Sequence, residues 1–185
     1  ATPVPTPGSC KLALCQLLVG DDKAANIAQA EKAIREAAAA GASVICLPEI
    51  WNGPYAVDKF EPYAEVLPPS AAQLSAEESP SAHMLQRVAM ELGVYLVGGS
   101  ISEKEGGKVY NTCLVFGPDG GLLCKHRKMH LFDIDVPGKI TFKESDTLTA
   151  GSELSLFDTP FGRIGVGICY DIRFPELAMI YREAG

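Results

Sequence analysis

The sequence predicts an α/β protein built on a mixed sheet, and three observations support this prediction. Segments with apolar residues at helical spacing alternate with short apolar runs of strand length. Two turn signals, EGG at 105–107 and PDGG at 118–121, join neighbouring apolar runs into antiparallel hairpins. The 185 residues contain no internal repeat and no linker, and this length suits one domain with a substantial core.

The expected elements follow from these patterns in chain order. A helix follows the first apolar run and stops at Gly41. A second helix has Ser79 as its N-cap and Pro80 at its first position, and it ends at Gly93. A third helix is expected over 175–183. The strand-like runs are KLALCQLLV (11–19), ASVICLPE (42–49), VYLVGGSISE (94–103), the pair in KVYNTCLVFGPDGGLLCKHRK (108–128) and the pair in LSLFDTPFGRIGVGICYD (154–171).

The segment 129–153 has little periodicity and many Asp, Thr, Pro and Gly residues. This composition predicts a long loop. Because loops of such length are usually functional, we expect it to lie near a binding site.

Composition excludes several kinds of partner. The net charge of −7 argues against a nucleic acid or an anionic membrane surface, both of which require a basic face. No apolar run is long enough to span a membrane. Residues 1–10 form a Pro-rich lead-in that we expect to be disordered and that lacks the apolar stretch of a secretory signal. The chain is therefore expected in the cytoplasm or in an organelle such as a mitochondrion or plastid, and not outside the cell.

The cysteine pattern favours reduced thiols over disulfides. Most of the six cysteines lie inside apolar runs, and no C-x-x-C motif occurs. A metal site at Cys124, His126 and His130 is the alternative, but His130 lies past the end of its strand, so no metal is expected. The six are Cys10, Cys15, Cys46, Cys113, Cys124 and Cys169.

Three reactive side chains stand at the ends of predicted strands, where open α/β sheets carry ligands and catalytic groups. Glu49 ends VICLPE, Lys128 ends LLCKHRK, and Cys169 ends IGVGIC. Hydrolysis of an amide by a thiol needs a thiolate, a proton carrier and a positive charge beside the developing oxyanion. A helix start directly after Cys169 would lower the pKa of its thiol.

Each of these residues also has a plain structural explanation. Glu49 could be a solvated loop carboxylate, Lys128 could belong to an exposed basic edge strand, and Cys169 could be a small core residue. GGSIS at 98–102 lacks the last glycine of a serine-hydrolase elbow, so Ser100 is expected to be structural.

The segments PEIW, HRKMHLF and GICYDIRFPEL around these three residues resemble the carbon–nitrogen hydrolases of the nitrilase superfamily, in the same order along the chain. KMHLFDIDVPGKITFKESDTLTAG (128–151) is most similar to the ω-amidase branch. The resemblance implies a four-layer α-β-β-α sandwich with mixed sheets. The family's domain continues past the nucleophile helix, so residues 11–185 should form about its N-terminal two thirds, with the C-terminal portion missing.

The resemblance also implies roles for individual residues. Cys169 would attack the amide carbon, and Lys128 with the backbone N–H of Tyr170 would stabilise the oxyanion. Glu49 would carry the proton, supported by Glu144 as a second glutamate. The reaction implied by the resemblance would proceed through a Cys thioester, release ammonia, and need no metal or organic cofactor.

The substrates implied by the resemblance are small ω-monoamides of keto-dicarboxylic acids, such as α-ketoglutaramate and α-ketosuccinamate. Arg173 would receive their carboxylate and Tyr55 would line the pocket, although Arg173 could instead form a structural ion pair with Glu176 or Asp171. A homodimer is expected, with the helix at 174–183 in the contact. Two alternatives remain: a non-catalytic homologue that serves as a subunit of a larger assembly, and an amidase for another small amide.

Overall fold

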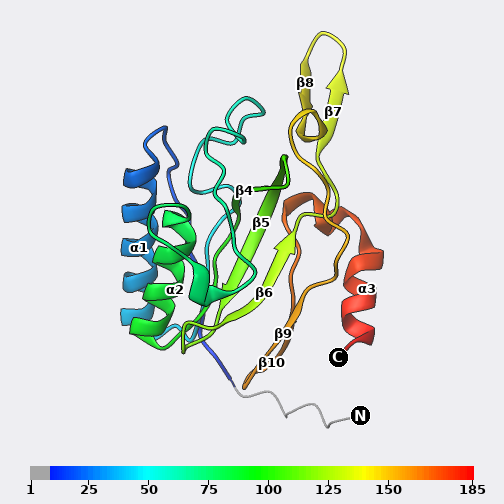
Figure 1. Ribbon diagram of the computed structural model, residues 1–185. Helices are drawn as coiled ribbons and strands as arrows, with labels where there is room; N and C mark the ends of the chain where they lie inside the picture. Colours follow the sequence, from blue (N-terminus) through cyan, green and yellow to red (C-terminus); the bar gives the residue numbers. More distant parts are fainter. Residues whose placement is uncertain (1–8) are drawn as a thin grey trace.

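The layers of the molecule are visible in the computed structural model, which describes residues 9–185 (Figure 1). Two helices cover one face of a six-stranded sheet, a two-stranded sheet lies on the other face, and a third helix lies beyond it. This order confirms the predicted α/β fold with mixed sheets. The lead-in predicted at 1–10 falls outside the described residues except for Ser9 and Cys10.

The three helices are α1 (Lys23–Ala39), α2 (Pro80–Leu92) and α3 (Pro175–Glu183), and they confirm the helical predictions. Gly41 and Gly93 follow the first two with φ values of +86° and +65°, which glycine adopts readily. No described helix has both the length and the apolar composition needed to cross a membrane. The remaining elements, with η for a 3-10 turn, are β1 (Leu12–Leu14), β2 (Val44–Cys46), η1 (Ala71–Gln73), β3 (Tyr95–Val97), β4 (Ile101–Glu105), β5 (Lys108–Phe116), β6 (Leu122–Arg127), β7 (Asp133–Val136), β8 (Ile140–Lys143), η2 (Glu144–Asp146), β9 (Leu156–Thr159), β10 (Gly162–Gly165) and η3 (Cys169–Arg173).

The large sheet has the strand order β1-β2-β3-β5-β4, with β6 paired to β5. β1, β2 and β3 are parallel, whereas β5 runs antiparallel to β3, β4 and β6. Thr112 of β5 pairs with both Ile101 and Arg127, so β4 and β6 lie on opposite edges of β5. β3 pairs with β5 at Val115, and Val115 also pairs with Cys124 of β6. β3 and β4 therefore lie end to end along the same edge of β5.

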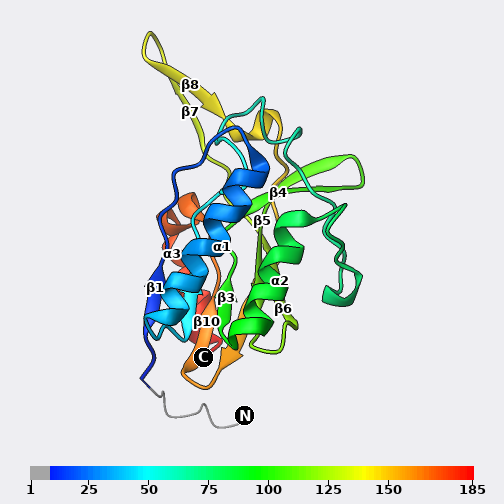
Figure 2. The same cartoon turned by 90° about the vertical axis from the view of Figure 1, so that its left-hand side faces the viewer.

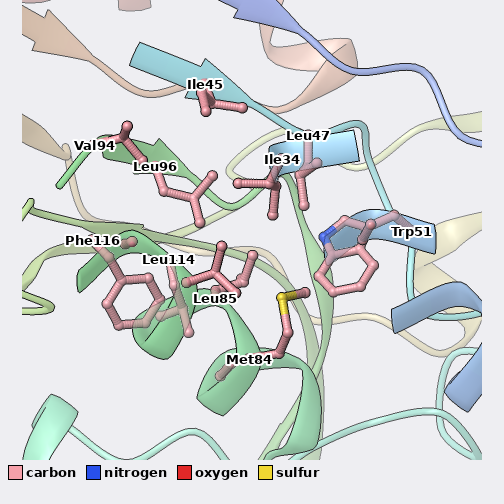
Figure 3. Packing of buried hydrophobic residues seen from close by; sticks show 14 of the residues in the cluster. Ile34, Ile45, Leu47, Trp51, Met84, Leu85, Val94, Leu96, Leu114 and Phe116 are labelled. Atoms are coloured by element: carbon pink, nitrogen blue, oxygen red, sulfur yellow. The ribbon is translucent and has the colours of Figure 1, made fainter. Parts of the chain in front are cut away.

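The main core lies between this sheet and the helices α1 and α2, which stand in front of it in Figure 2. Alternate residues of β5 point toward the helices, and Figure 3 shows Leu114 and Phe116 packed against Leu85 of α2. Ile34 of α1 and Trp51 complete the cluster with no exposed surface. Burial of each such side chain contributes about 1.5–3 kcal/mol.

A second apolar cluster lies on the opposite face of the sheet. Cys113 and Val115 of β5 pack there against Phe157 of β9, with Val166 and Ile168 beside them. Because Ile168 immediately precedes Cys169, this cluster fixes the base of the segment that carries the predicted nucleophile.

The strand predicted over 94–103 is interrupted at 98–100, between β3 and β4. Gly99 has φ +60°, and a Cβ atom there would lie 2.1 Å from the carbonyl oxygen of Pro48. The break exists because the backbone of 47–51 approaches the sheet edge at this point, which no side chain at Gly99 would permit.

The segment 129–153 is not a continuous loop as predicted. It contains the antiparallel hairpin β7–β8 with a turn at Gly138, where φ is +74°, followed by η2. The two strands have four residues each and alternate apolar with acidic or polar side chains, a pattern too short and too polar to stand out in the sequence.

The start of α2 also differs from its prediction. Ser79 precedes the helix, but its hydroxyl donates to the carbonyl of Ser75 and makes no capping hydrogen bond. The buried carboxylate of Glu65 takes that place, accepting from the backbone N–H of Ser81 at 3.1 Å and from the Ser81 hydroxyl at 2.6 Å. The N–H groups of the first turn are therefore satisfied by a residue that is distant in sequence. A local sequence pattern cannot reveal such a contact.

Candidate active site

The predicted site residues lie on segments that directly follow strands. Glu49 comes three residues after β2, Lys128 immediately follows β6, and Cys169 opens η3 four residues after β10. Glu144 opens η2 after the β7–β8 hairpin. The structure thus brings the predicted Glu, Lys and second Glu into one hydrogen-bonded group, with the thiol of Cys169 beside it.

Lys128 is the centre of this group and is completely buried. Its Nζ atom donates to Oε1 of Glu49 at 2.9 Å and to Glu144, whose Oε2 lies at 2.9 Å. Burial disfavours the ammonium charge, but the hydrogen bonds and charges of the two carboxylates outweigh it and raise the pKa of Lys128. Lys128 is therefore held as a cation, and its three donors face one oxygen of Glu49 and both oxygens of Glu144.

Glu144 is the second carboxylate that holds Lys128. Its carboxylate is buried and also accepts from the backbone N–H of Phe132 at 2.6 Å and from the hydroxyl of Tyr55 at 2.8 Å. Burial, followed by the charge of Glu49, raises the pKa of Tyr55, so its hydroxyl remains a donor to Glu144. These contacts fix Glu144 as an anchor.

The segment that carries Glu49 is held against the break in the sheet edge. Ser100 accepts from the backbone N–H of Ile50 through its hydroxyl at 3.0 Å, and its own N–H donates to the carbonyl of Pro48 at 3.0 Å. The indole N–H of Trp51 donates to the carbonyl of Gly98 at 2.7 Å. Ile50 has φ +45°, a conformation that costs a β-branched residue about 1–3 kcal/mol. Ser100 thus has a structural role, because it holds the segment that carries Glu49 against the sheet edge.

Cys169 also has a strained backbone, with φ +48°. Ile50 and Cys169 are the two non-glycine residues with a positive φ in the described chain. Ile50 adjoins Glu49, and Cys169 belongs to the site itself. The expected lowering of its pKa is wrong, because burial and then the negative charge of Glu49 raise the pKa of the thiol to about 11. Cys169 opens a 3-10 turn, and the α-helix whose N–H groups should have lowered its pKa begins only at Pro175.

Asp171 ties the nucleophile segment to the segment after Lys128, a role that the sequence did not suggest. Its Oδ2 accepts from the backbone N–H of Ile168 at 2.8 Å, and its Oδ1 accepts from the backbone N–H of His130 at 2.9 Å. His130 Nδ1 lies 2.7 Å from Oδ1, and the buried His126 places Nε2 3.5 Å from Oδ2. Although burial opposes it, hydrogen bonding from His126, Ile168 and His130 lowers the pKa of Asp171 to about 2.

The two histidines considered as metal ligands therefore both face Asp171. His126 Nδ1 lies 3.0 Å from the hydroxyl of Ser155, and the ring of His130 stacks on Phe174 at 3.6 Å between centroids. Within residues 9–185 no group of three or more His, Cys, Asp or Glu side chains has an arrangement that could hold a metal ion.

The remaining predicted residues lie at the rim. Tyr55 is 40% exposed and stacks on Phe142 of β8 at 5.3 Å. Tyr170 follows Cys169 in η3. Arg173 ends η3 with an exposed side chain, and among the described residues it forms no ion pair with Asp171 or Glu176. The structural role considered for Arg173 is therefore not observed, because Asp171 is occupied by the histidines.

Two cavities open beside Cys169. One of about 170 Å³ lies between Glu49 and Cys169 and is lined by Ser100 and Cys113. The other, of about 380 Å³, follows η3 and α3, where Phe174 and Leu177 line it. The thiol thus faces space large enough for a small molecule.

Comparison with known proteins identifies the family of the chain. The family model for carbon–nitrogen hydrolases matches residues 11–185, and the chain belongs to that family. It is 55% identical to the chloroplastic omega-amidase of Arabidopsis thaliana, covering 100% of this chain and 49% of the relative. It is 53% identical to omega-amidase NIT2 of Homo sapiens, covering 96% of this chain and 60% of that protein.

A solved structure extends the comparison to the fold. Saccharomyces cerevisiae Nit3, a member of branch 10 of the nitrilase superfamily, superimposes with a TM-score of 0.81 at 40% identity. The match covers 95% of this chain and 60% of Nit3. The chain thus spans between about half and three fifths of the length of the relatives that it matches.

The depressed pKa of Asp171 predicts acid sensitivity. Its folded pKa of about 2 lies below an unfolded value near 4, so its contribution to stability is present above pH 4 and is lost as pH falls through 2. We expect the free energy of unfolding to fall by about 2 kcal/mol more in the natural protein than in Asp171→Asn over this range, measured by urea unfolding. The exposed Asp58, which forms no ion pair within residues 9–185, provides the control, since Asp58→Asn should leave the acid loss intact. Equal losses in the natural protein and Asp171→Asn would contradict the assignment.

Proposed function

We propose that the protein hydrolyses the terminal amide of small ω-monoamides of keto-dicarboxylic acids through a Cys169 thioester. The observation that carries this proposal is the buried ammonium of Lys128, held between Glu49 and Glu144 beside the thiol. The omega-amidase names of relatives at 53% and 55% identity support the choice of substrate class.

The first step requires a proton acceptor. With a pKa of about 11, the thiol of Cys169 is protonated near neutral pH. Glu49 faces it and would accept the S–H proton while sulfur forms a bond to the amide carbon. The C=O electron pair then moves to oxygen and gives a tetrahedral oxyanion.

The oxyanion needs donors already in position. The Nζ atom of Lys128 lies within 3.0 Å of one Glu49 oxygen and both Glu144 oxygens, and one of its three N–H donors would turn from Glu144 to the oxyanion. The N–H of Tyr170, the second residue of η3, has no acceptor within its own turn. We assign these two groups to the oxyanion, where preorganised donors are most effective.

The later steps balance with the same groups and water. Collapse of the tetrahedral species breaks the C–N bond, and Glu49 returns its proton to the departing nitrogen, which leaves as ammonia. Glu49 then takes a proton from water as the water oxygen attacks the thioester carbon. Collapse breaks the C–S bond, the proton returns to sulfur, and a carboxylic acid is released.

The protein should release ammonia from α-ketoglutaramate, and Cys169→Ala should abolish the release because no other group can form the thioester. Lys128→Met should lower kcat by about 10²–10³-fold through the lost oxyanion donor. Ammonia is measured by a coupled assay. Cys10→Ala changes an exposed thiol outside the site and should match the natural protein. Undiminished release by Cys169→Ala would exclude this mechanism, and no release by the natural protein would overturn the substrate assignment.

The substrate carboxylate needs a cation at the rim of the site, and we propose Arg173. Its guanidinium is exposed and is paired with neither Asp171 nor Glu176 among the described residues. It belongs to the same 3-10 turn as Cys169, and Tyr55 provides an apolar wall near Glu144.

Arg173→Gln should raise the KM for α-ketoglutaramate by about 10- to 100-fold, the value of one charge-assisted hydrogen bond. The KM for an uncharged amide such as butyramide should not change. Arg182→Gln removes an exposed arginine of α3 and serves as the matched control. An equal rise for both amides would show that Arg173 is structural.

We also propose that α3 contacts a second copy in a homodimer. Apolar side chains are exposed there, with Met179 at 60% and Ile180 at 45%. Light scattering should give the molar mass of a dimer, and Met179→Glu should shift it toward the monomer. A larger hetero-assembly, or a monomer, would contradict this assignment.

A further inference from the structure

Asn111 of β5 contacts both polar ends of the proposed proton-transfer group, although its side chain has no role in the mechanism above. Its Nδ2 atom donates to Oε1 of Glu49 at 2.9 Å. Its backbone carbonyl accepts from the backbone N–H of Lys128 at 2.8 Å. Asn111 is completely buried and pairs with Ser102 of β4, so the sheet itself fixes its position.

The orientation of the Asn111 amide follows from its acceptor. A carboxylate has no proton to donate, so the atom that faces Glu49 must be the NH₂ nitrogen. The other amide atom, Oδ1, is buried without a hydrogen-bond partner among the described residues. Leaving a buried carbonyl unpaired is unfavourable, and it is tolerated where the rest of the structure over-determines the conformation.

Glu49 is consequently held by one of its two oxygens. Asn111 and Lys128 both donate to Oε1, at 2.9 Å each, which leaves Oε2 as the oxygen that neither donor engages. We propose that Asn111 is a positioning residue that fixes the Glu49 carboxylate so that Oε2 exchanges the proton with Cys169. This inference rests on the proposed function, since it assigns the proton transfer to Glu49.

A neutral donor suits this position because of the charges around Glu49. Lys128 is a cation, Glu144 is an anion that shares Lys128, Cys169 is a thiol, and the phenol of Tyr55 lies near enough to feel the charge of Glu49. Asn111 stabilises the ionised carboxylate and adds no charge. With Asn111 in place, Lys128 is one of two donors that anchor Glu49 and not the sole one.

The direction of the pH effect follows from this arrangement. Removing a donor from a carboxylate favours its protonated form, so the pH below which Glu49 stops accepting the thiol proton should rise. We expect Asn111→Leu to move the acid limb of the Cys169 alkylation profile upward by about one pH unit. Asn111→Asp, which has the same shape but places a second carboxylate beside Glu49, should move it further.

The test is the rate of iodoacetamide alkylation of Cys169 between pH 4 and 9, with Cys169→Ala subtracted as background. Asn52→Leu is the matched control: Asn52 is also completely buried, donates Nδ2 to a glutamate, Glu65, and has an unpartnered Oδ1. It should lower stability and leave the acid limb in place. Circular dichroism and urea unfolding establish that each variant is folded.

The expected result is an upward shift in both Asn111 variants and none in Asn52→Leu. An unshifted limb in a folded Asn111→Leu overturns the proposal. If Asn111→Leu does not fold, the alkylation profile of the isosteric Asn111→Asp variant is the test. An upward shift of its acid limb supports the proposal, and an unshifted limb overturns it. Because alkylation needs no amide substrate, a shift observed in a protein that releases no ammonia from α-ketoglutaramate would sustain the role of Asn111 and reject only the substrate.

Discussion

The structure of the site depends on one constraint, the pairing of a fully buried ammonium with two carboxylates. An unpaired cation at the position of Lys128 would be too costly to bury, and one partner alone would leave it poorly compensated. Glu49 and Glu144 come from separate segments of the chain, and together they outweigh the desolvation of the charge. The hairpin β7–β8 and η2 are therefore structural requirements of the site, because they deliver Glu144.

Backbone geometry supports this pairing. The break between β3 and β4 admits the backbone of 47–51. The two positive φ values lie at Ile50, next to the proposed proton acceptor Glu49, and at Cys169 itself. Strain of this kind persists only where packing and hydrogen bonds over-determine the conformation. Ser100 and Trp51 supply those bonds on one side, and Asp171 supplies them on the other. The rigid scaffold thus holds two unfavourable backbone conformations side by side.

The sequence predicted the parts of this structure that depend on local pattern. Helix limits at Gly41 and Gly93 and the hairpin turns followed from composition and periodicity, and the family resemblance identified Glu49, Lys128, Glu144 and Cys169. Contacts between distant segments could not be predicted. Three such contacts are the capping of α2 by Glu65, the contact of Asn111 with Glu49 and the bridge through Asp171. Each joins residues that are far apart in the sequence and that only the fold brings together. The raised pKa of Cys169 was missed for the same reason, since it depends on burial and on Glu49.

The charges of the site bear on substrate choice. Glu49 and Glu144 contribute two negative charges and Lys128 one positive charge, so the group carries a formal charge of −1 beside the thiol. Burial, and after it the charge of Glu49, keeps the thiol protonated, and the net negative charge of the group would repel the carboxylate of an anionic amide. Lys128 cannot compensate, because two carboxylates already engage it. An anionic substrate would therefore need a separate cation beyond this group. Arg173, which we propose for that role, is exposed at the end of η3 and is paired with neither Asp171 nor Glu176 among the described residues.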